Sequence, residues 1–331
     1  MRTIAIDAMG GDFGSLPVVD GTILALKKSK EKFNVILVGD SKTFSHRIPK
    51  RLSKYIDIVE CDDVFSMEES ATNVLKRKES TIYKAVELVR DGKANAVVSA
   101  GHSGATMSLA TLRIGRLEGV KRAAIATMMP TVEGGRSLVL DAGANTDCKS
   151  EHLFQFALMG ESYFKDVLKN DSVRVGLLAN GEEDSKGNDL TKESFELLKK
   201  LPSFIGNVEG GDIFNGTCDV IVCDGFVGNI VLKTSEGVAG SISKLIKQNI
   251  RKSPTALTGA LLMRRVFKLL KKQMDYAEYG GAPLLGIDGC AIICHGKSNP
   301  KAIKNAIYQA LSVVESNFNE DIKENIKKYQ S

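Results

Sequence analysis

Residues 3–38 read TIAIDAMGGDFGSLPVVDGTILALKKSKEKFNVILV and contain the pattern that recurs along the chain. A short apolar strand is expected at Thr3–Ile6, and a loop with two glycines follows it. A helix is expected at Pro17–Lys30, because a proline shortly after Ser15 is typical of a helix N-terminus. A second strand is expected at Val35–Val38. Strands that alternate with helices in this way favour an α/β fold with a largely parallel sheet.

The same alternation continues to the end of the chain. Helices are expected at Ser80–Arg90, Ser150–Phe164 and Ser298–Asn317. The further apolar segments expected as strands are Ile56–Val59, Ala96–Ser99, Ala124–Met128, Leu138–Leu140, Val173–Leu178, Val220–Cys223 and Ala291–Cys294. With no linker of low complexity, residues 1–331 are expected to form one unit, with two lobes and a cleft between them.

Composition places the chain among globular proteins. It has 331 residues, of which 43% are hydrophobic and 26% charged, and its net charge is +5. This charge is too modest to argue for nucleic acid as a partner. No apolar run approaches the length of a membrane span, and Met1 and Arg2 lead directly into the first strand without a secretory signal. A cytoplasmic protein is expected.

The six cysteines support a reducing compartment. None of them forms a CxxC pair, which argues against a zinc ribbon or a thioredoxin-type site. Most lie in or beside apolar strands, where cysteine behaves as a small hydrophobic residue. We expect core thiols at Cys218, Cys223, Cys290 and Cys294.

Four expected strands are followed at once by loops of glycine and polar residues. The loops are Asp7–Asp12, Ser99–Gly104, Cys223–Asn229 and Cys294–Ser298. Ligands of parallel α/β sheets bind beyond the carboxyl ends of the strands. Glycine allows close approach of the backbone, and helix N-termini offer N–H groups to anions. The four loops together therefore predict an anion-binding cleft.

Familiar nucleotide and nucleophile motifs are missing. No G-x-G-x-x-G follows a strand, and Gly296-Lys297-Ser298 resembles the end of a P-loop but has Ala291 where the first glycine belongs. No G-x-S-x-G elbow occurs. Cys294 and His295 are neighbours on a strand end, so their side chains should point to opposite faces rather than form a nucleophile–base pair.

Two further polar segments follow strands, Asp141–Asn145 and Asn180–Asn188. The second contains three acidic residues, which favour a solvated loop over a metal site, and then Lys186. A lysine beside a phosphate cleft can neutralise the anion and stabilise charge that develops during reaction. His102 and His295 are the two histidines that lie in glycine loops.

An ordered set of motifs resembles the family of bacterial acyl-carrier-protein:phosphate acyltransferases of fatty acid and phospholipid synthesis. The resemblance runs from about Ile4 to about Leu311, and no single motif carries it. The chain departs from the family pattern at His102-Ser103, where members usually have Asn-Thr. The motifs are AMGGD, SAGHSGA, GVKRAAIAT, DAGAN, NGEEDSKGN, NVEGGD, CDGFVGN, and YGGAPLLG followed by HGKS.

The resemblance implies a three-layer α/β/α fold like that of isocitrate and isopropylmalate dehydrogenases and phosphotransacetylase. It also implies a homodimer, acyl-carrier protein as acyl donor, and peripheral association with the inner face of the cell membrane. The implied reaction is attack of inorganic phosphate on an acyl thioester, which gives acyl-phosphate. No cofactor and no metal are expected.

Direct attack by phosphate requires positioning and stabilisation of an oxyanion rather than a covalent intermediate. The residues expected to act in catalysis are Lys186, Asn229, His295 and Asn180. The residues expected to bind or orient the substrates are Asp7, Gly10, Gly11, Asp12, Ser99, Gly101, His102, Ser103, Gly104, Asn145, Asp224, Gly296 and Ser298. Two alternatives stay open: a metal- and NAD-dependent hydroxy-acid dehydrogenase of the related fold, and a non-enzymatic membrane scaffold.

The segment Gly237–Met274 has a composition of its own, with nine Lys or Arg residues and no Asp or Glu. Pro254 is expected to divide it into two helical pieces. On a single second helix, Leu262 and Val266 would share an apolar side opposite Arg264, Lys268, Lys271 and Lys272. This pattern predicts contact with an anionic membrane through Leu257, Leu261, Leu262 and Val266, or packing against a dimer partner.

Overall fold

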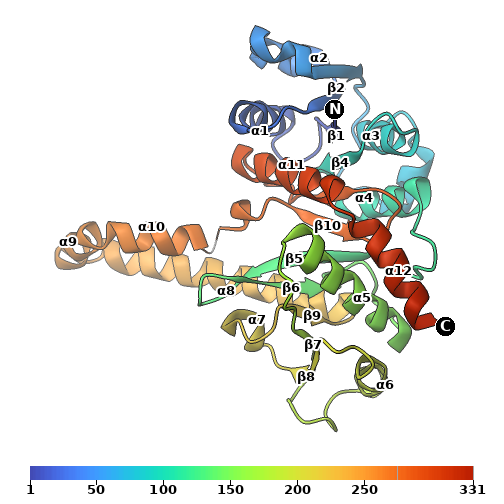
Figure 1. Cartoon of the computed structure of the whole chain (residues 1–331). Helices are drawn as coiled ribbons and strands as arrows, with labels where there is room; N and C mark the ends of the chain where they lie inside the picture. The colour runs from blue at the N-terminus through green and yellow to red at the C-terminus, as the bar shows by residue number, and fades with distance from the viewer. Residues whose placement is uncertain (274, 331) are drawn as a thin grey trace.

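A computed structural model describes residues 1–273 and 275–330 as an α/β protein built on one 11-stranded sheet (Figure 1). The strand order is β3-β2-β1-β4-β11-β10-β5-β6-β9-β7-β8. The strands are β1 (Thr3–Asp7), β2 (Asn34–Gly39), β3 (Ile56–Glu60), β4 (Ala96–Ser99), β5 (Ala124–Pro130), β6 (Arg136–Leu140), β7 (Val175–Leu178), β8 (Phe204–Val208), β9 (Val220–Val222), β10 (Ala282–Leu285) and β11 (Ala291–Ile293).

Helices cover both faces of the sheet, which confirms the expected three layers. Alternate residues of β1 enter different cores: Ile4 and Ile6 pack with α1 and α11, whereas Ala5 packs with α3 and α4. The helices are α1 (Ser15–Lys28), α2 (Ser41–Phe44), α3 (Thr81–Arg90), α4 (Ser103–Leu109), α5 (Ser150–Ser162), α6 (Asp189–Leu198), α7 (Asp212–Asn215), α8 (Gly225–Arg251), α9 (Pro254–Leu262), α10 (Arg264–Gln273), α11 (Pro300–Glu315) and α12 (Phe318–Gln330).

The sheet is largely parallel, as expected, but it reverses direction near its centre. β10 is antiparallel to both β11 and β5, and β5 is antiparallel to β6. The strands β1, β4 and β11 therefore run in the opposite direction to β6, β9 and β7. Carboxyl ends of the two sets point to opposite edges of the sheet.

The strands expected from the sequence all form, with ends shifted by one or two residues. β8 and β10 had not been expected. The β8 sequence FIGNV contains glycine and the β10 sequence APLL contains proline, and both residues are unfavourable in strands. Hydrogen bonds to neighbouring strands stabilise them instead: β8 pairs with β7, and β10 pairs with β5 and β11.

Helices α8, α9 and α10 form an arm that extends from the body and folds back on itself (Figure 1). The expected division at Pro254 is confirmed, because α8 ends at Arg251 and α9 begins at Pro254. The expected number of helical pieces is wrong, because a second break at Met263 separates α9 from α10. Leu262 and Val266 thus belong to different helices and share no stripe. Met274, the last residue of the basic segment, and the side chains of Lys271 and Lys272 lie outside the described residues.

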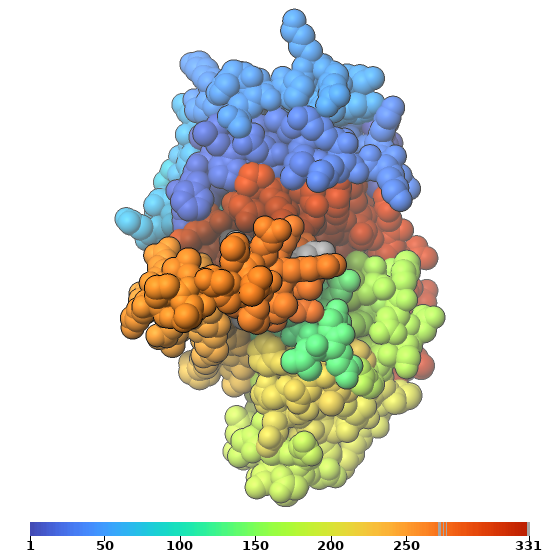
Figure 2. Space-filling view, turned by 90° about the vertical axis from the view of Figure 1, so that its left-hand side faces the viewer, coloured from blue at the N-terminus to red at the C-terminus, as the bar shows by residue number. Residues whose placement is uncertain are grey.

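Side chains of the arm leave a large apolar surface in contact with solvent. Leu262 is 81% exposed and Leu261 is 66% exposed, whereas an ordinary core leucine is almost fully covered. In the space-filling view the orange arm projects toward the viewer, between the blue N-terminal segment above and the green-to-yellow middle of the chain below (Figure 2). Among the described residues, no helix has both the length and the apolar character needed to cross a bilayer.

Candidate active site

Three glycine loops meet at the carboxyl ends of the adjacent strands β1, β4 and β11. We call Asp7–Asp12, Ser99–Gly104 and His295–Ser298 the first loop group. The N–H of Asp12 donates a 2.8 Å hydrogen bond to the carbonyl of Gly296. The backbone of Gly101 lies so close to Gly10 that a Cβ on Gly10 would stand 2.7 Å from its nitrogen. Glycine is required at this position because a side chain would collide with the neighbouring loop.

We call the backbone of Gly10, Gly11, Gly101, Gly104 and Gly296 the glycine floor. Buried polar atoms lie beneath it. Asp7 and Ser99 are 2% and 1% exposed, and the Ser99 hydroxyl donates to Oδ2 of Asp7 over 2.8 Å. Burial raises the pKa of Asp7, and the hydrogen bond from Ser99 offsets part of that shift. Oδ1 of Asp7 and the hydroxyl of Ser298 have no hydrogen-bond partner among the residues that the structure describes. Unpaired buried groups of this kind are costly unless a ligand or water completes them.

The two histidines of the first loop group have different surroundings. His102 is the N-cap of α4, where its Nδ1 accepts a hydrogen bond from the N–H of Ala105 over 3.2 Å. An asparagine side chain would make the same kind of N-cap contact at this position. His295 is exposed, and its Nδ1 accepts a hydrogen bond from the N–H of Lys297.

A second loop group forms at the opposite edge, at the carboxyl ends of the adjacent strands β6, β9 and β7. It consists of Asp141–Asn145, Asp224–Asn229 and Asn180–Asn188. The prediction that four loops share one edge is therefore wrong for Asp224–Asn229, because its strand runs in the other direction. That stretch is also not a free loop: Asp224 caps the first turn of α8 by accepting from the N–H of Val227.

Asp141 organises the second loop group; the sequence placed it in a polar segment after a strand but did not single it out as a site residue. Its fully buried carboxylate accepts hydrogen bonds from four backbone N–H groups and from the Asn145 amide. Asn145 in turn accepts from the N–H of Gly225 over 2.7 Å, which fastens the loop to α8. Gly143 faces Asn229 at van der Waals distance. The position of Asp141 at a strand end, like that of Asp7, is the feature that could have identified it.

Asn180 and Lys186 lie together in the exposed loop that follows β7. Oδ1 of Asn180 accepts from the N–H of Gly187 over 2.8 Å. Nζ of Lys186 is 3.9 Å from Oε1 of Glu183, and the lysine side chain is 45% exposed. This loose pair leaves the ammonium group accessible to an anion.

The cysteine thiols have the character of core residues, as expected. Cys294 is 1% exposed, and burial raises the pKa of its thiol to about 12. Burial also raises the pKa of Cys223 well above its usual value. Such thiols form little thiolate, which is the reactive form.

The fold resembles those of a phosphotransacetylase and of a 4-hydroxythreonine-4-phosphate dehydrogenase. A phosphotransacetylase from Streptococcus pyogenes matches with a TM-score of 0.62 and 16% identity, covering 95% of this chain and 94% of that one. A 4-hydroxythreonine-4-phosphate dehydrogenase from Klebsiella pneumoniae matches with a TM-score of 0.53 and 12% identity, over 95% and 100%. At these identities the likeness concerns the fold alone.

Sequence comparison defines the family. The model of the family described as "Fatty acid synthesis protein" matches residues 2–321. A phosphate acyltransferase from Nitratiruptor sp. is 62% identical over 99% of this chain and 98% of its own length. The phosphate acyltransferase of Campylobacter fetus is 61% identical over 99% of both chains. The chain belongs to this family of fatty acid synthesis proteins, as the motifs had indicated.

Proposed function

We propose that this protein is a phosphate acyltransferase that moves a fatty acyl group from acyl-carrier protein to inorganic phosphate. The observation that carries the proposal is identity near 60% along the whole chain to phosphate acyltransferases. The glycine floor of the first loop group and the unpaired hydroxyl of Ser298 support it, since both suit an anionic ligand. The product, acyl-phosphate, would enter phospholipid synthesis.

The proposed mechanism is direct attack of phosphate on the thioester carbonyl. Phosphate is already a nucleophile and a thioester is an activated acyl group, so the protein has to orient both and stabilise the tetrahedral oxyanion. Backbone amides of Gly101–Gly104, with Gly10, Gly11, Gly296 and Ser298, are proposed to hold one anionic group. Lys186, Asn180, Asn229 and His295 are proposed to donate to the oxyanion or the phosphate. Asp12, Asn145 and Asp224 orient these groups.

Release of free carrier thiol tests the reaction. Purified protein with acyl-carrier thioester should release thiol and form acyl-phosphate only when phosphate is added. Thiol release that does not depend on phosphate, or no release at all, would refute the proposed activity.

The proposal also requires the two loop groups to meet. β4 and β9 lie five positions apart in the sheet order. A sheet twists by about 20° per strand pair, and we propose that this twist turns the two edges toward each other; the alternative is contact across a dimer. Mixing two inactive variants, Ser298→Ala and Lys186→Ala, distinguishes these cases. Activity returns in the mixture only if the site is shared between two copies.

We further propose a cytoplasmic homodimer that contacts the inner face of the cell membrane. The support is the arm, on which the exposed Leu257, Leu261 and Leu262 lie close to basic residues of α8 and α10. Val266 on α10 is also exposed. Exposed apolar side chains beside cations suit an anionic bilayer surface.

A further inference from the structure

Residues 61–80 form a long segment between β3 and α3 that lies over the first loop group. The ring of Phe65 packs edge-on against His102, with centroids 5.8 Å apart. Ala71, at the start of a 3₁₀ turn, faces Gly104, since a Cβ on that glycine would stand 3.0 Å from the Cβ of Ala71. The Cε of Met67 would be equally close to a Cβ on Gly296. The segment 61–80 therefore borders the glycine floor on one side.

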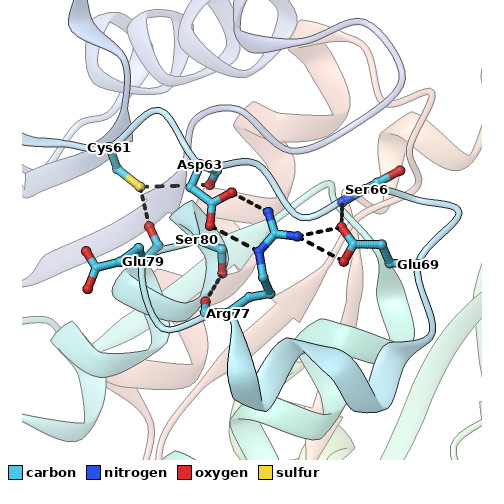
Figure 3. A network of polar contacts seen from close by, with 7 residues as sticks. All are labelled: Cys61, Asp63, Ser66, Glu69, Arg77, Glu79 and Ser80. Carbon is cyan, nitrogen blue, oxygen red and sulfur yellow. Dashed lines mark hydrogen bonds and ion pairs between the residues drawn. The ribbon is translucent and has the colours of Figure 1, made fainter.

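Arg77 holds this segment in place (Figure 3). Its guanidinium lies between two carboxylates, donating to both oxygens of Asp63 and to both oxygens of Glu69. Glu69 also accepts from the N–H of Ser66, and the hydroxyl of Ser80 donates to the carbonyl of Arg77. A planar guanidinium that donates to two carboxylates restrains the segment between them more strongly than a single ion pair does.

The fixed segment presents apolar side chains to solvent at the rim of a polar site. Met67 is 45% exposed and Val64 is 38% exposed, although Phe65 between them is buried. Phe13 is 62% exposed and directly follows Asp12, whose N–H donates to the carbonyl of Gly296. Exposed apolar groups gathered beside convergent polar groups mark binding surfaces.

A ligand that fits both parts has an anionic or carbonyl head and an apolar tail. Resting on the function proposed above, we propose that Met67, held in place by Arg77, contacts the fatty acyl chain and determines selectivity for long chains. The thioester carbonyl would lie over the glycine floor while the chain leaves past Met67 and Phe13. Methionine suits this role because its flexible side chain adapts to chains of different shape.

The test compares long-chain and short-chain acyl thioesters of the carrier protein with wild type, Met67→Ala and the control Ile205→Ala. Ile205 is 48% exposed but lies on β8, at the far edge of the sheet. Met67→Ala should lower kcat/KM for the long chain by about tenfold and leave the short chain within about twofold. The control should change neither value.

Arg77→Lys provides a second variant, because it keeps the charge and loses the fork. It should show the same selective loss for long chains, together with faster proteolytic cleavage within residues 62–79. Equal losses for both chain lengths, or none, would overturn the inference while the proposed activity stands. A Met67→Ala protein that changes from dimer to monomer would overturn it in favour of a contact between copies. A wild type without phosphate-dependent thiol release would overturn both proposals.

Discussion

The hydroxyl of Ser99 donates a 2.8 Å hydrogen bond to the carboxylate of Asp7, and the Oγ of Ser99 accepts a 3.0 Å hydrogen bond from the N–H of Gly101. This pair ties the carboxyl end of β1 to that of β4 beneath the glycine floor. Asp7 is buried, and no ion pair joins it to a cation among the described residues. The shape of the first loop group therefore depends on this neutral donor.

Ser99→Ala should destabilise the fold, because it leaves the N–H of Gly101 without its acceptor and removes one hydroxyl donor from Asp7. The expected loss in the free energy of unfolding is about 1–3 kcal/mol, measured by urea denaturation. Ser53→Ala is the matched control, since it removes an exposed hydroxyl that bonds only the carbonyl of Lys50. Equal stability of the Ser99 variant and wild type would show that the bond is not needed.

Lys186→Ala should lower acyl-phosphate formation at least about tenfold, which corresponds to about 1.4 kcal/mol of transition-state stabilisation. The reason is that Lys186 carries the only positive charge in the Asn180–Asn188 loop, and an anion bound there would lose its interaction with this charge. Lys192→Ala, at an exposed site on the following helix α6, should retain full activity. If a folded Lys186→Ala protein turns over like wild type, Lys186 does not belong to the site.

Cys223→Ser and Cys294→Ser should retain the chemistry and lose some stability, since each places a hydroxyl in an apolar core. The expected cost in the free energy of unfolding is about 1–3 kcal/mol. Intact-protein mass spectrometry during turnover provides the second measurement. An acyl group trapped on any cysteine would contradict direct attack by phosphate.

Asp166 should make stability depend on pH. Burial and the nearby carboxyl of Asp321 raise the pKa of Asp166 to about 6, above the ordinary 3.8. Because the pKa of Asp166 is higher in the folded protein than in the unfolded chain, the folded protein is favoured when Asp166 is protonated. The contribution of Asp166 to stability is therefore fully present below about pH 4 and is lost as the pH rises through about 6. Asp166→Asn should therefore gain stability over wild type at about pH 8 and not at about pH 4.

Because Asp166 is only half-buried, this gain should stay below about 1 kcal/mol, or a few degrees in Tm. Asp171→Asn, at an exposed position nearby, should show no such difference between the two pH values. A Tm difference that is the same at both would show that Asp166 titrates normally.

The double variant Leu261→Glu, Leu262→Glu should stop the protein from floating with anionic liposomes, because it places two charges at the tip of the arm. Neutral liposomes should bind less of each protein than anionic liposomes do, since they offer no anionic headgroups to the basic residues near the tip. Ile205→Glu, away from the arm, should float like wild type. A double variant that becomes an inactive monomer would assign these leucines to the dimer interface instead.

Local pattern was sufficient to predict most of the elements. Apolar runs located the strands from β1 to β7, β9 and β11, because most of these segments are buried on both faces and rich in Val, Ile and Leu. The exception is the edge strand β3, in which only Ile56 is buried. Local pattern failed for β10, whose APLL sequence contains proline and forms a strand only between β11 and β5. It also failed at Met263, where neither glycine nor proline indicates that the arm breaks.

The candidate site divides in the same way. Loop residues such as Gly10, Gly101 and Ser298 could be predicted because glycine and polar residues directly after a strand have few other uses. The sequence placed Asp141 in a polar segment after a strand, but the contact with the N–H of Ile125 could not be predicted from that position. Met67 and Arg77 could not be predicted as site residues either, and Met67 lies against Gly296, far away in the chain. Arg77 joins residues nearer in sequence, but its loop has no periodic pattern to reveal them.

The α/β class, the glycine loops and the family could be predicted from the sequence, because each depends on short contiguous stretches. Which loops share an edge of the sheet could be seen only in the folded protein. That outcome depends on strand direction, which antiparallel β10, β5 and β6 reverse between the two loop groups. Strand pairing is fixed by contacts between segments far apart in the chain and by burial of both faces, and no local window of sequence contains that information.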